Sequence, residues 1–325
     1  MMKLDKKDLR ILDALDKNPH LPVNDIAKRV GVSRQVAEYR LNRLISQKII
    51  SAFFTFVDVA TLGYTLFRVH FRLKNSTRET YQKFAANLYQ DYPCLWIALM
   101  SGSFDLIFDV FAPSPQELQD MLIEIVHQNK NIIQSYESLL VLSMNIYQYG
   151  YFLKPEPERR KITFNQKRDS ITLDDKNRKI LALIKHNCRL AYEVIGKKVG
   201  LTRNAVKSRI KQMEEKGIIA GYGMFVTFSH LNKKSFKVFI KYNPQKRDEE
   251  KSLLNYLKST PGILATLQLF GQWDLDIEIH QDDIQRLQEF MMDLRNRFGI
   301  IEDYDIVPII EEFGIDFFPQ KLTKT

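Results

Sequence analysis

Two short segments of this sequence carry polar side chains suited to reading the edges of base pairs. In the first, Arg34 and Gln35 follow Ser33, and in the second, Arg203 and Asn204 follow Thr202. Arginine pairs with guanine in the major groove of duplex DNA, and glutamine or asparagine pairs with adenine. The candidate DNA-contacting residues of the two segments are Ser33, Arg34, Gln35, Glu38, Arg40, Asn42, Arg43, Thr202, Arg203, Asn204, Lys207, Arg209 and Lys211.

The position of a side chain along each segment predicts its role. Residues near the N-terminus of such a helix reach base edges, whereas arginine and lysine further along hold phosphates. For any single residue, a solvated helix face is the competing interpretation. Arg40 and Arg209 occupy the same helix position, and either phosphate contact or an ion pair inside the domain would explain them. The residues expected to contact bases are Arg34, Gln35, Arg203, Asn204 and Lys207.

Each segment is expected to be the third helix of a helix-turn-helix domain. Apolar residues predict a first helix that ends before Pro19, and a second helix is expected over 23–30. Gly31 then supplies the positive φ of a tight turn, and Ser33 caps a third helix over 33–47. The outward side chains of this third helix are expected to be Arg34, Gln35, Glu38, Asn42 and Arg43.

The whole arrangement occurs twice, because the chain is an internal duplication. An ungapped shift of 169 residues lays the segment from Leu4 onto the segment from Leu173, with Gly200 and Thr202 in the places of Gly31 and Ser33. The same shift places residues 102–105 on residues 271–274. A register kept over about 100 residues indicates a repeated structural unit.

Charge alternates along the chain in step with the repeat. Residues 1–53 carry a net charge of +5 and residues 172–222 one of +7, whereas residues 54–153 and 223–325 each carry −3. A protein that binds a polyanion through two of its modules would concentrate positive charge there. The duplicated helix-turn-helix modules are therefore the expected DNA-binding parts.

The acidic modules are expected to form small sheets with helices on one face. After each third helix comes a segment, IISAFFTFV or IIAGYGMFV, that resembles the strand pair of a wing. The pattern that follows predicts strand, helix, strand, strand, helix, strand, which is the split βαβ arrangement. The free face of such a sheet is too apolar for water, so two sheets should pair. The predicted fold class is α+β, with two winged helix-turn-helix domains alternating with two βαββαβ (ferredoxin-like) domains.

The predicted domains are therefore a first winged helix-turn-helix over 1–53, a first βαββαβ domain over 54–153, a second winged helix-turn-helix over 172–222 and a second βαββαβ domain over 223–325. Residues 154–171 contain prolines and charge with little apolar periodicity, which predicts a solvated linker. Contact of its basic residues with phosphate is the alternative.

Composition narrows the functional classes. The chain of 325 residues is 45% hydrophobic with a net charge of +9, and no segment has the length of apolar sequence that a membrane span or a signal peptide needs. Two distant cysteines, Cys94 and Cys188, predict neither a disulfide framework nor a metal site, and the histidines show no metal-binding spacing. We expect a cytoplasmic protein without cofactor or metal and without a membrane partner.

Each half resembles a member of the Lrp/AsnC (feast/famine) family of prokaryotic transcription regulators. The residues that carry the resemblance in the first half are Leu4, Asp5, Ile11, Leu12, Ile26, Ala27, Val30, Gly31, Ser33, Arg40, Leu44, Ile50, Leu62, Gly63, Tyr64, Gly102 and Asp105. Those in the second half are Leu173, Asp174, Ile180, Leu181, Ile195, Val199, Gly200, Thr202, Arg209, Gly217, Ile218, Ile219, Gly271 and Asp274.

The resemblance implies a nucleoid-associated regulator whose βαββαβ (RAM) domains pair subunits and sense a small effector, typically an amino acid. In that family the effector binds near a Gly-x-x-Asp hairpin. The candidate effector-binding residues here are Ser101, Gly102, Asp105, Gly271 and Asp274. The turn itself also calls for glycine and aspartate, which is a competing reason for these residue types.

Three alternatives stay open at this point. Sirohaem decarboxylases resemble fused copies of the same unit, although the segments PCLWIALMSGSFDLIF and ILATLQLFGQWDLDIE lack the histidine cluster expected there. A sensing or assembly protein without DNA binding would keep the fold. The sheets could pair within one chain, so that two unlike readers address an asymmetric operator, or between the two chains of a homodimer.

Overall fold

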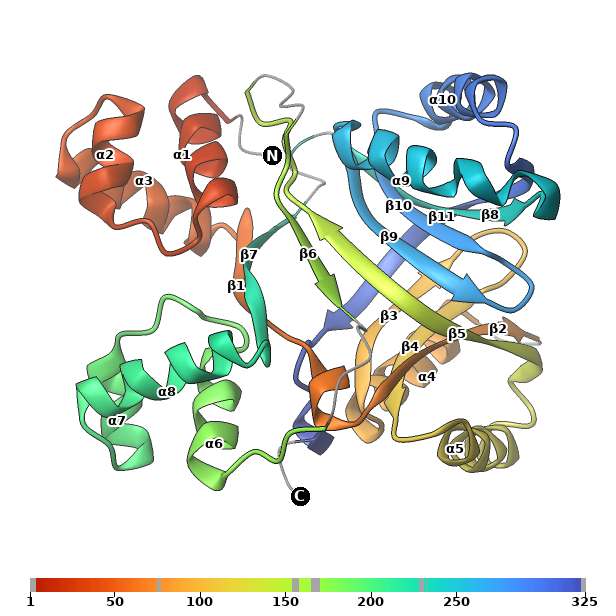
Figure 1. Ribbon diagram of the computed structural model, residues 1–325, viewed down its shortest axis with the longest axis horizontal. Coiled ribbons are helices and arrows are strands. Elements are labelled where there is room, and N and C mark those ends of the chain that lie inside the picture. The colour runs from red at the N-terminus through yellow and green to blue at the C-terminus, as the bar shows by residue number, and fades with distance from the viewer. Residues whose placement is uncertain are drawn as a thin grey trace.

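In the computed structural model, which describes residues 4–74, 77–153, 158–164, 170–227, 231 and 233–322, two helical domains lie side by side at one end and a barrel lies at the other (Figure 1). The first helical domain contains α1 (Lys6–Lys17), α2 (Val23–Val30) and α3 (Arg34–Ser46). The second contains α6 (Asp175–Ile184), α7 (Tyr192–Val199) and α8 (Arg203–Glu215). The predicted helices of both helix-turn-helix domains are confirmed within one or two residues.

Local sequence signals set the ends of these helices. Asp5 caps α1 in a capping box with Asp8. The Asp5 carboxylate accepts from the backbone amide of Asp8, and the Asp8 carboxylate accepts from the backbone amide of Asp5. Gly31 and Gly200 end α2 and α7 with φ of 73° and 66°, in the left-handed region that favours glycine. The apolar faces then pack together, with Ile11 and Leu44 fully buried. The turn between the second and third helices is therefore built twice in the same way.

The wing segments do not form a hairpin within each module, which corrects that part of the prediction. Each makes a single strand, β1 (Ile50–Val57) or β7 (Ile219–Val226), and the two strands pair with each other antiparallel. This ribbon joins the two helical domains across the duplication. The domain limits at residues 53 and 222 fall inside these strands. A pattern of alternating residues predicts a strand but not which strand it pairs with.

Two βαββαβ domains follow, as the sequence predicted, and the α+β fold class is confirmed. The first has η1 (Val59–Leu62), β2 (Thr65–Leu73), α4 (Arg78–Asp91), β3 (Cys94–Met100), β4 (Leu106–Ala112), α5 (Pro115–Gln128) and β5 (Ile133–Tyr147). The second has β8 (Lys234–Tyr242), η3 (Pro244–Glu249), α9 (Glu250–Ser259), β9 (Ile263–Phe270), β10 (Leu275–Gln281), α10 (Ile284–Arg297), β11 (Ile301–Ile315) and η4 (Gln320–Leu322).

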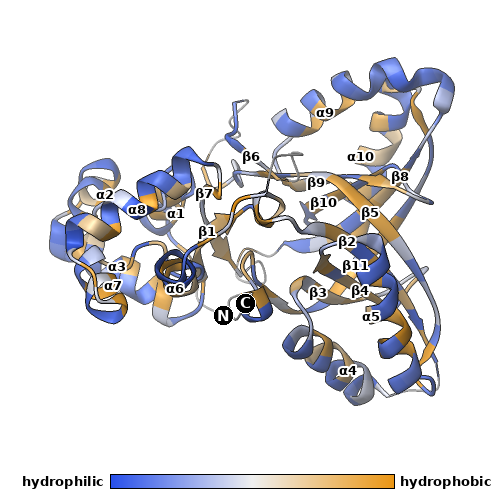
Figure 2. Ribbon diagram, turned by 60° about the horizontal axis from the view of Figure 1, so that its bottom comes forward, coloured by the Kyte–Doolittle hydropathy of each residue, from blue (hydrophilic) through white to orange (hydrophobic). Residues whose placement is uncertain are grey.

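The two sheets pair within the one chain and close into a barrel. The last strand of each unit crosses over, so that β5 pairs with β9 and β11 pairs with β3. Because β5 also pairs with β2, the strands β2-β4-β3-β11-β8-β10-β9-β5 form a closed ring. Helices α9 and α10 cover one side of the barrel, and α4 and α5 cover the other (Figure 2). Closure removes the sheet edges and turns the free faces of both sheets toward each other.

Part of the segment predicted as a solvated linker is built into this barrel. Residues Lys161–Phe164 form β6, which pairs with the end of β5, while 154–157 and 165–169 lie outside the described residues. Arg159 is buried and donates to the carbonyl oxygens of Gln148, Leu257, Lys258, Thr260 and Ile263. One basic side chain of this segment thus satisfies the C-terminal end of α9 instead of facing water.

Three further observations concern the part of the chain that the structure describes. None of its helices combines the length and apolar character needed to span a membrane. No three His, Cys, Asp or Glu side chains in it are grouped to hold a metal ion. Cys94 and Cys188 are both buried free thiols, and burial raises the pKa of Cys188 to about 12.

Candidate nucleic-acid interface and hairpin cavity

The first turns of α3 and α8 present the predicted base-contacting side chains to solvent. The Ser33 hydroxyl accepts from the amide of Val36 (3.3 Å), and the Thr202 hydroxyl accepts from the amide of Ala205 (3.2 Å). Each cap satisfies a backbone amide that has no partner within its helix. The predicted DNA-contacting residues that are exposed are Ser33, Arg34, Gln35, Glu38, Asn42, Thr202, Arg203, Asn204, Lys207 and Lys211.

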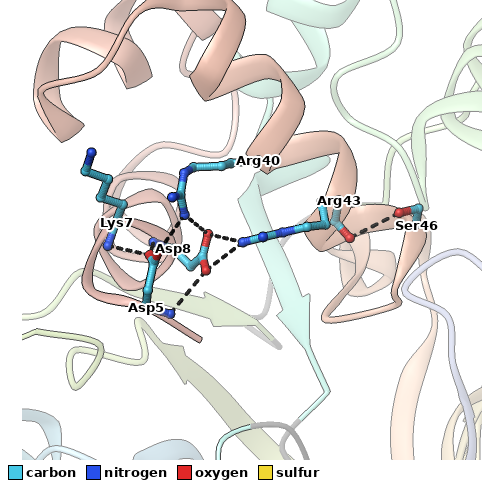
Figure 3. A network of polar contacts seen from close by, with 6 residues as sticks. All are labelled: Asp5, Lys7, Asp8, Arg40, Arg43 and Ser46. Atoms are coloured by element: carbon cyan, nitrogen blue, oxygen red, sulfur yellow. Dashed lines mark hydrogen bonds and ion pairs between the residues drawn. The ribbon is translucent and has the colours of Figure 1, made fainter. Parts of the chain in front are cut away.

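Arg40 and Arg43 are instead tied to the first helix (Figure 3). Arg40 donates to Asp5 (2.8 Å) and to Asp8 (2.9 Å), and Arg43 donates to both oxygens of Asp8 at 2.8 Å. Asp8 is almost fully buried, so these guanidinium groups balance a buried carboxylate. The prediction that Arg43 turns outward is wrong, because its guanidinium is bonded to the buried carboxylate of Asp8 in α1.

The second domain repeats part of this network. Arg209 donates to Asp174 and to the side chain of Asn177 (2.6 and 3.0 Å), which take the places of Asp5 and Asp8. The Arg209 side chain lowers the pKa of Asp174. The recurring arginine of the third helix therefore holds that helix against the cap of the first. Of the two roles open for Arg40 and Arg209, the internal ion pair is the one present in the structure.

Sequence reasoning missed an exposed aromatic residue on α3. Tyr39 keeps 67% of its surface accessible and Val36 keeps 40%, whereas α8 has Ser208 and Ala205 at the equivalent places. An outward tyrosine carries no periodic signal, since it breaks the apolar pattern that marks a core face. The two reading surfaces therefore differ in chemistry, one being partly apolar and the other being basic.

The Gly-x-x-Asp hairpins lie where the two units meet. The carboxylate of Asp105 accepts from the amide of Leu73 (2.8 Å), and the carbonyl of Gly102 accepts from Arg72 (2.6 Å). In the second unit Asp274 accepts from the amide of Tyr242 (2.9 Å). These aspartates fasten each hairpin to the neighbouring strand.

Each hairpin also rests on the last strand of the other unit. The amide of Ser101 donates to the carbonyl of Pro308 (3.1 Å), and Val307 lies beside Gly102. In the second hairpin, Leu139 lies so close that a Cβ added to Gly271 would meet it at 2.5 Å. The five candidate effector residues thus come together in two places that are related by the duplication.

A cavity of about 230 Å³ opens beside the first hairpin. His70 lies at its base, Arg72 and Glu137 line its sides, and Phe104 and Trp273 supply aromatic walls. His70 is 3% exposed, and neither of its ring nitrogens has a hydrogen-bond partner among the described residues. Its Nδ1 lies 3.8 Å from the carboxylate of Glu137, which is beyond hydrogen-bond reach, and burial lowers the pKa of His70. An unpaired buried imidazole is costly unless a ligand or water satisfies it.

Sequence reasoning also missed a charged cluster inside the barrel, hereafter the barrel cluster. Arg68 donates to both oxygens of Asp109 (2.7 and 2.6 Å) and to Asp276. Lys237, which occupies the position of Arg68 in the second copy, donates to Asp276 (3.2 Å) and Glu278 (2.9 Å). The members of the barrel cluster are Arg68, Trp96, Asp109, Lys237, Asp276, Glu278 and Glu312. A signal was present, namely a cation at the centre of an apolar strand in both copies.

Comparison with known proteins assigns both helical domains. Residues 4–51 match a family described as winged helix-turn-helix DNA-binding, and residues 173–214 match the AsnC-type helix-turn-helix domain. An uncharacterized HTH-type transcriptional regulator of Pyrococcus horikoshii is 25% identical over 140 residues, which is 42% of this chain and 93% of that protein. The HTH-type transcriptional regulator AldR of Mycobacterium tuberculosis is 24% identical over 139 residues, covering 42% of this chain and 78% of that protein.

A likeness over the full length is found among solved structures. The crystal structure of the siroheme decarboxylase NirDL covers 98% of this chain and 96% of its own, with a TM-score of 0.65 and 13% sequence identity. At that identity the likeness concerns the fold alone. The transcriptional regulators match about one unit of this chain, and the fused fold accounts for its doubled length. The chain therefore consists of two Lrp/AsnC-type units in tandem, each a helix-turn-helix domain followed by a βαββαβ domain.

Proposed function

We propose that this chain is a transcription regulator that binds duplex DNA through α3 and α8, and that one chain addresses two unequal half-sites. The observation that carries the proposal is the duplicated helix-turn-helix, in which a left-handed glycine and a capped helix start present polar side chains to solvent. The net charges of +5 and +7 on residues 1–53 and 172–222 supply attraction to phosphate. Such a protein works beside the chromosome, in the cytoplasm of a prokaryote.

Pairing within the chain supports a monomeric reader. The ribbon of β1 and β7 connects the ends of both reading helices, and the closed barrel pairs the two sheets without a second chain. The positions of Gln35 and Tyr39 on α3 are occupied by Asn204 and Ser208 on α8. Because the two reading helices carry different side chains, the two half-sites should differ. A measurement of mass in solution, alone and on DNA, checks whether one chain occupies one operator.

Mapping of chromosomal DNA bound by the chain would identify its operator and test the proposal. On that operator, Arg34→Ala and Arg203→Ala should each weaken specific binding by about 1–3 kcal/mol if both side chains read bases. Lys251→Ala, on the distant helix α9, is the matched control and should leave affinity unchanged. The logarithm of affinity should fall by about 0.9 per phosphate contact for each tenfold rise in salt. Absence of duplex binding at low salt would favour the sensing or assembly function.

We further propose that the cavity beside the first hairpin holds a small zwitterionic effector such as an amino acid. Arg72 is suited to a carboxylate, Glu137 to an ammonium group, and the aromatic walls to an apolar side chain. Phe239 stands in the second unit where His70 stands in the first, so this site is expected once per chain. Calorimetric titration with individual amino acids tests it, with His70→Phe and Glu137→Gln expected to remove binding.

Decarboxylation of a tetrapyrrole is the second candidate, favoured by the full-length likeness in fold. An enzyme of that kind needs cations for the substrate's carboxylates. Arg68 lies inside the barrel, but its guanidinium is already bonded to Asp109 and Asp276. We therefore prefer the regulator. Incubating the purified chain with sirohaem and analysing the products decides between them, because loss of carboxyl groups would establish the enzyme.

A further inference from the structure

A second cavity lies beneath the β1–β7 ribbon, at the mouth of the barrel that faces the helical domains. Its free volume is about 110 Å³. Strands β1 and β7 line it from the side of the helical domains, and β5, β9 and the end of β11 line it from the side of the barrel. Its principal apolar lining residues are Phe54, Phe56, Tyr147, Met224, Ala265 and Phe317. The cavity thus touches both copies and both kinds of domain.

The floor of this cavity is acidic. Glu278 lines it and keeps 16% of its side-chain surface accessible, although it belongs to the barrel cluster deep in the protein. Asp16 lines it as well, with its two oxygens accepting from the amides of Tyr149 and Gly150. The one cation among the lining residues, Arg160, is exposed and donates to the carbonyl of Tyr222 (2.7 Å).

Negative charge in the barrel cluster exceeds positive charge. Three of its acidic side chains, Asp109, Asp276 and Glu278, pair with its two cations, Arg68 and Lys237, and the fourth, Glu312, accepts from Trp96. One oxygen of Asp276 is buried without a hydrogen-bond partner among the described residues. Burial and the neighbouring Glu278 raise the pKa of Glu312 to about 7. Uncompensated buried carboxylates are costly, and an added cation would offset that cost.

The aromatic walls of the cavity also favour a positively charged ligand. Phe56 and Phe317 meet edge to face, with centroids 4.7 Å apart, and Phe54 packs on Phe317 at 5.7 Å. Aromatic faces attract organic cations, and they do so most strongly where water is excluded. The free volume is somewhat below the roughly 150 Å³ of a cavity known to accept benzene. A compact alkyl group with one charged nitrogen fits both the size and the charge.

From this geometry we infer that the cavity beneath the ribbon is a binding site for a small alkylamine, whose ammonium group lies against Glu278 and whose apolar body lies among Phe54, Phe56 and Phe317. The site differs from the hairpin cavity in place and in ligand class, since two carboxylates line it and its lining cation, Arg160, is exposed and bonded to the carbonyl of Tyr222. Binding of the amine does not depend on the proposed function, but its effect on DNA binding does. Because β1 and β7 follow directly after α3 and α8, a ligand that packs against the ribbon would change the position of the two reading helices.

Calorimetric titration of the full chain with isobutylamine tests the inference, with isobutanol and isobutyrate as neutral and anionic probes of similar shape. We expect one saturable site per chain for the amine, and affinities at least about tenfold weaker for the other two probes, because the alcohol cannot form an ion pair with Glu278 and the carboxylate is repelled by it. Equal binding of amine and alcohol would overturn the role of the acidic floor. No saturable binding of the amine would overturn the site.

Two variants and a control locate the ligand. Glu278→Gln should weaken amine binding by about tenfold or more, and Ala265→Leu should abolish it by filling the cavity, while circular dichroism confirms that both variants fold. Glu302→Gln, at the exposed start of β11 and away from both cavities, should bind the amine like the unaltered chain. Amine binding that survives Ala265→Leu would refute the location. DNA binding is measured separately on the same samples, so failure of the regulator proposal and failure of this one are distinguishable.

Discussion

Replacing Arg68 by methionine should destabilise the barrel strongly. Arg68 is 1% exposed, and its guanidinium bonds to Asp109 of its own unit and to Asp276 of the other. It is therefore a buried ionic link between the two copies. Methionine keeps much of the apolar stem but leaves Asp109 without its cation and leaves Asp276 with Lys237 alone, at 3.2 Å.

The expected loss follows from the burial of these charges. Removing one partner of a buried ion pair costs roughly 3–5 kcal/mol, because an uncompensated charge stays in a poorly polarisable interior. A loss of about 4 kcal/mol lowers the equilibrium constant for folding by nearly three powers of ten. Arg203→Met is the matched control, since Arg203 pairs with Glu193 at 2.8 Å on the exposed surface. Such surface pairs contribute about 0–1 kcal/mol.

Equilibrium unfolding in urea measures both variants. Trp96 reports on the barrel directly, because the Arg68 guanidinium lies 5.9 Å from its ring centre. We expect the barrel transition of Arg68→Met to move to lower urea with little change in slope, since the surface exposed on unfolding is nearly the same. If its loss of stability stays within about 1 kcal/mol of the Arg203 control, the buried-charge reasoning is refuted.

The same experiment has a defined dependence on pH. Burial opposes ionisation of Asp276, but Lys237 and Arg68 together lower its pKa below the ordinary 3.8. In the unaltered chain its contribution to stability is therefore present above pH 3.8 and is lost as the pH falls through the lower folded pKa. Without Arg68, burial should favour the protonated acid, so the deficit of the variant should shrink as the pH is lowered toward 4. A deficit that is constant from pH 7 to 4 would contradict the ionic explanation.

Three further predictions follow from other buried groups. Burial raises the pKa of Asp16 to about 6, so relative to Asp16→Asn the unaltered chain should lose up to about 3 kcal/mol of stability as the pH rises from 4 to 6; parallel stability profiles would contradict this. Arg40→Met removes one partner of the buried Asp8 and should lower stability by about 1–3 kcal/mol in thermal unfolding, whereas an unchanged melting temperature would mean that Arg43 suffices. Gly196→Ala places a Cβ 2.5 Å from the carbonyl oxygen of Leu201 and should cost about 1–3 kcal/mol in the same assay; no loss would show that the turn adjusts to a methyl group, which the first copy carries at the equivalent Ala27.

The local elements were predictable because their signals are short-range. Asp5, Ser33 and Thr202 cap helices through bonds to amides two or three residues away, and Gly31 and Gly200 mark turns that few other residues can adopt. The exposed polar face of α3 followed from the same periodicity. Arg43 escaped this reasoning, because its partner Asp8 is 35 residues distant and only packing of α1 against α3 brings the two together.

The sequence by itself determined the duplication, the order of the elements and the segregation of charge, because a repeat, an apolar period and a cap are each written in neighbouring residues. Only the tertiary structure decided that β1 pairs with β7, that β5 and β11 cross over to close one barrel within the chain, and that Arg68 and Lys237 contact three carboxylates inside it. Strand partners and buried ion pairs depend on which surfaces meet, and residues more than a hundred positions apart leave no local pattern that announces their contact.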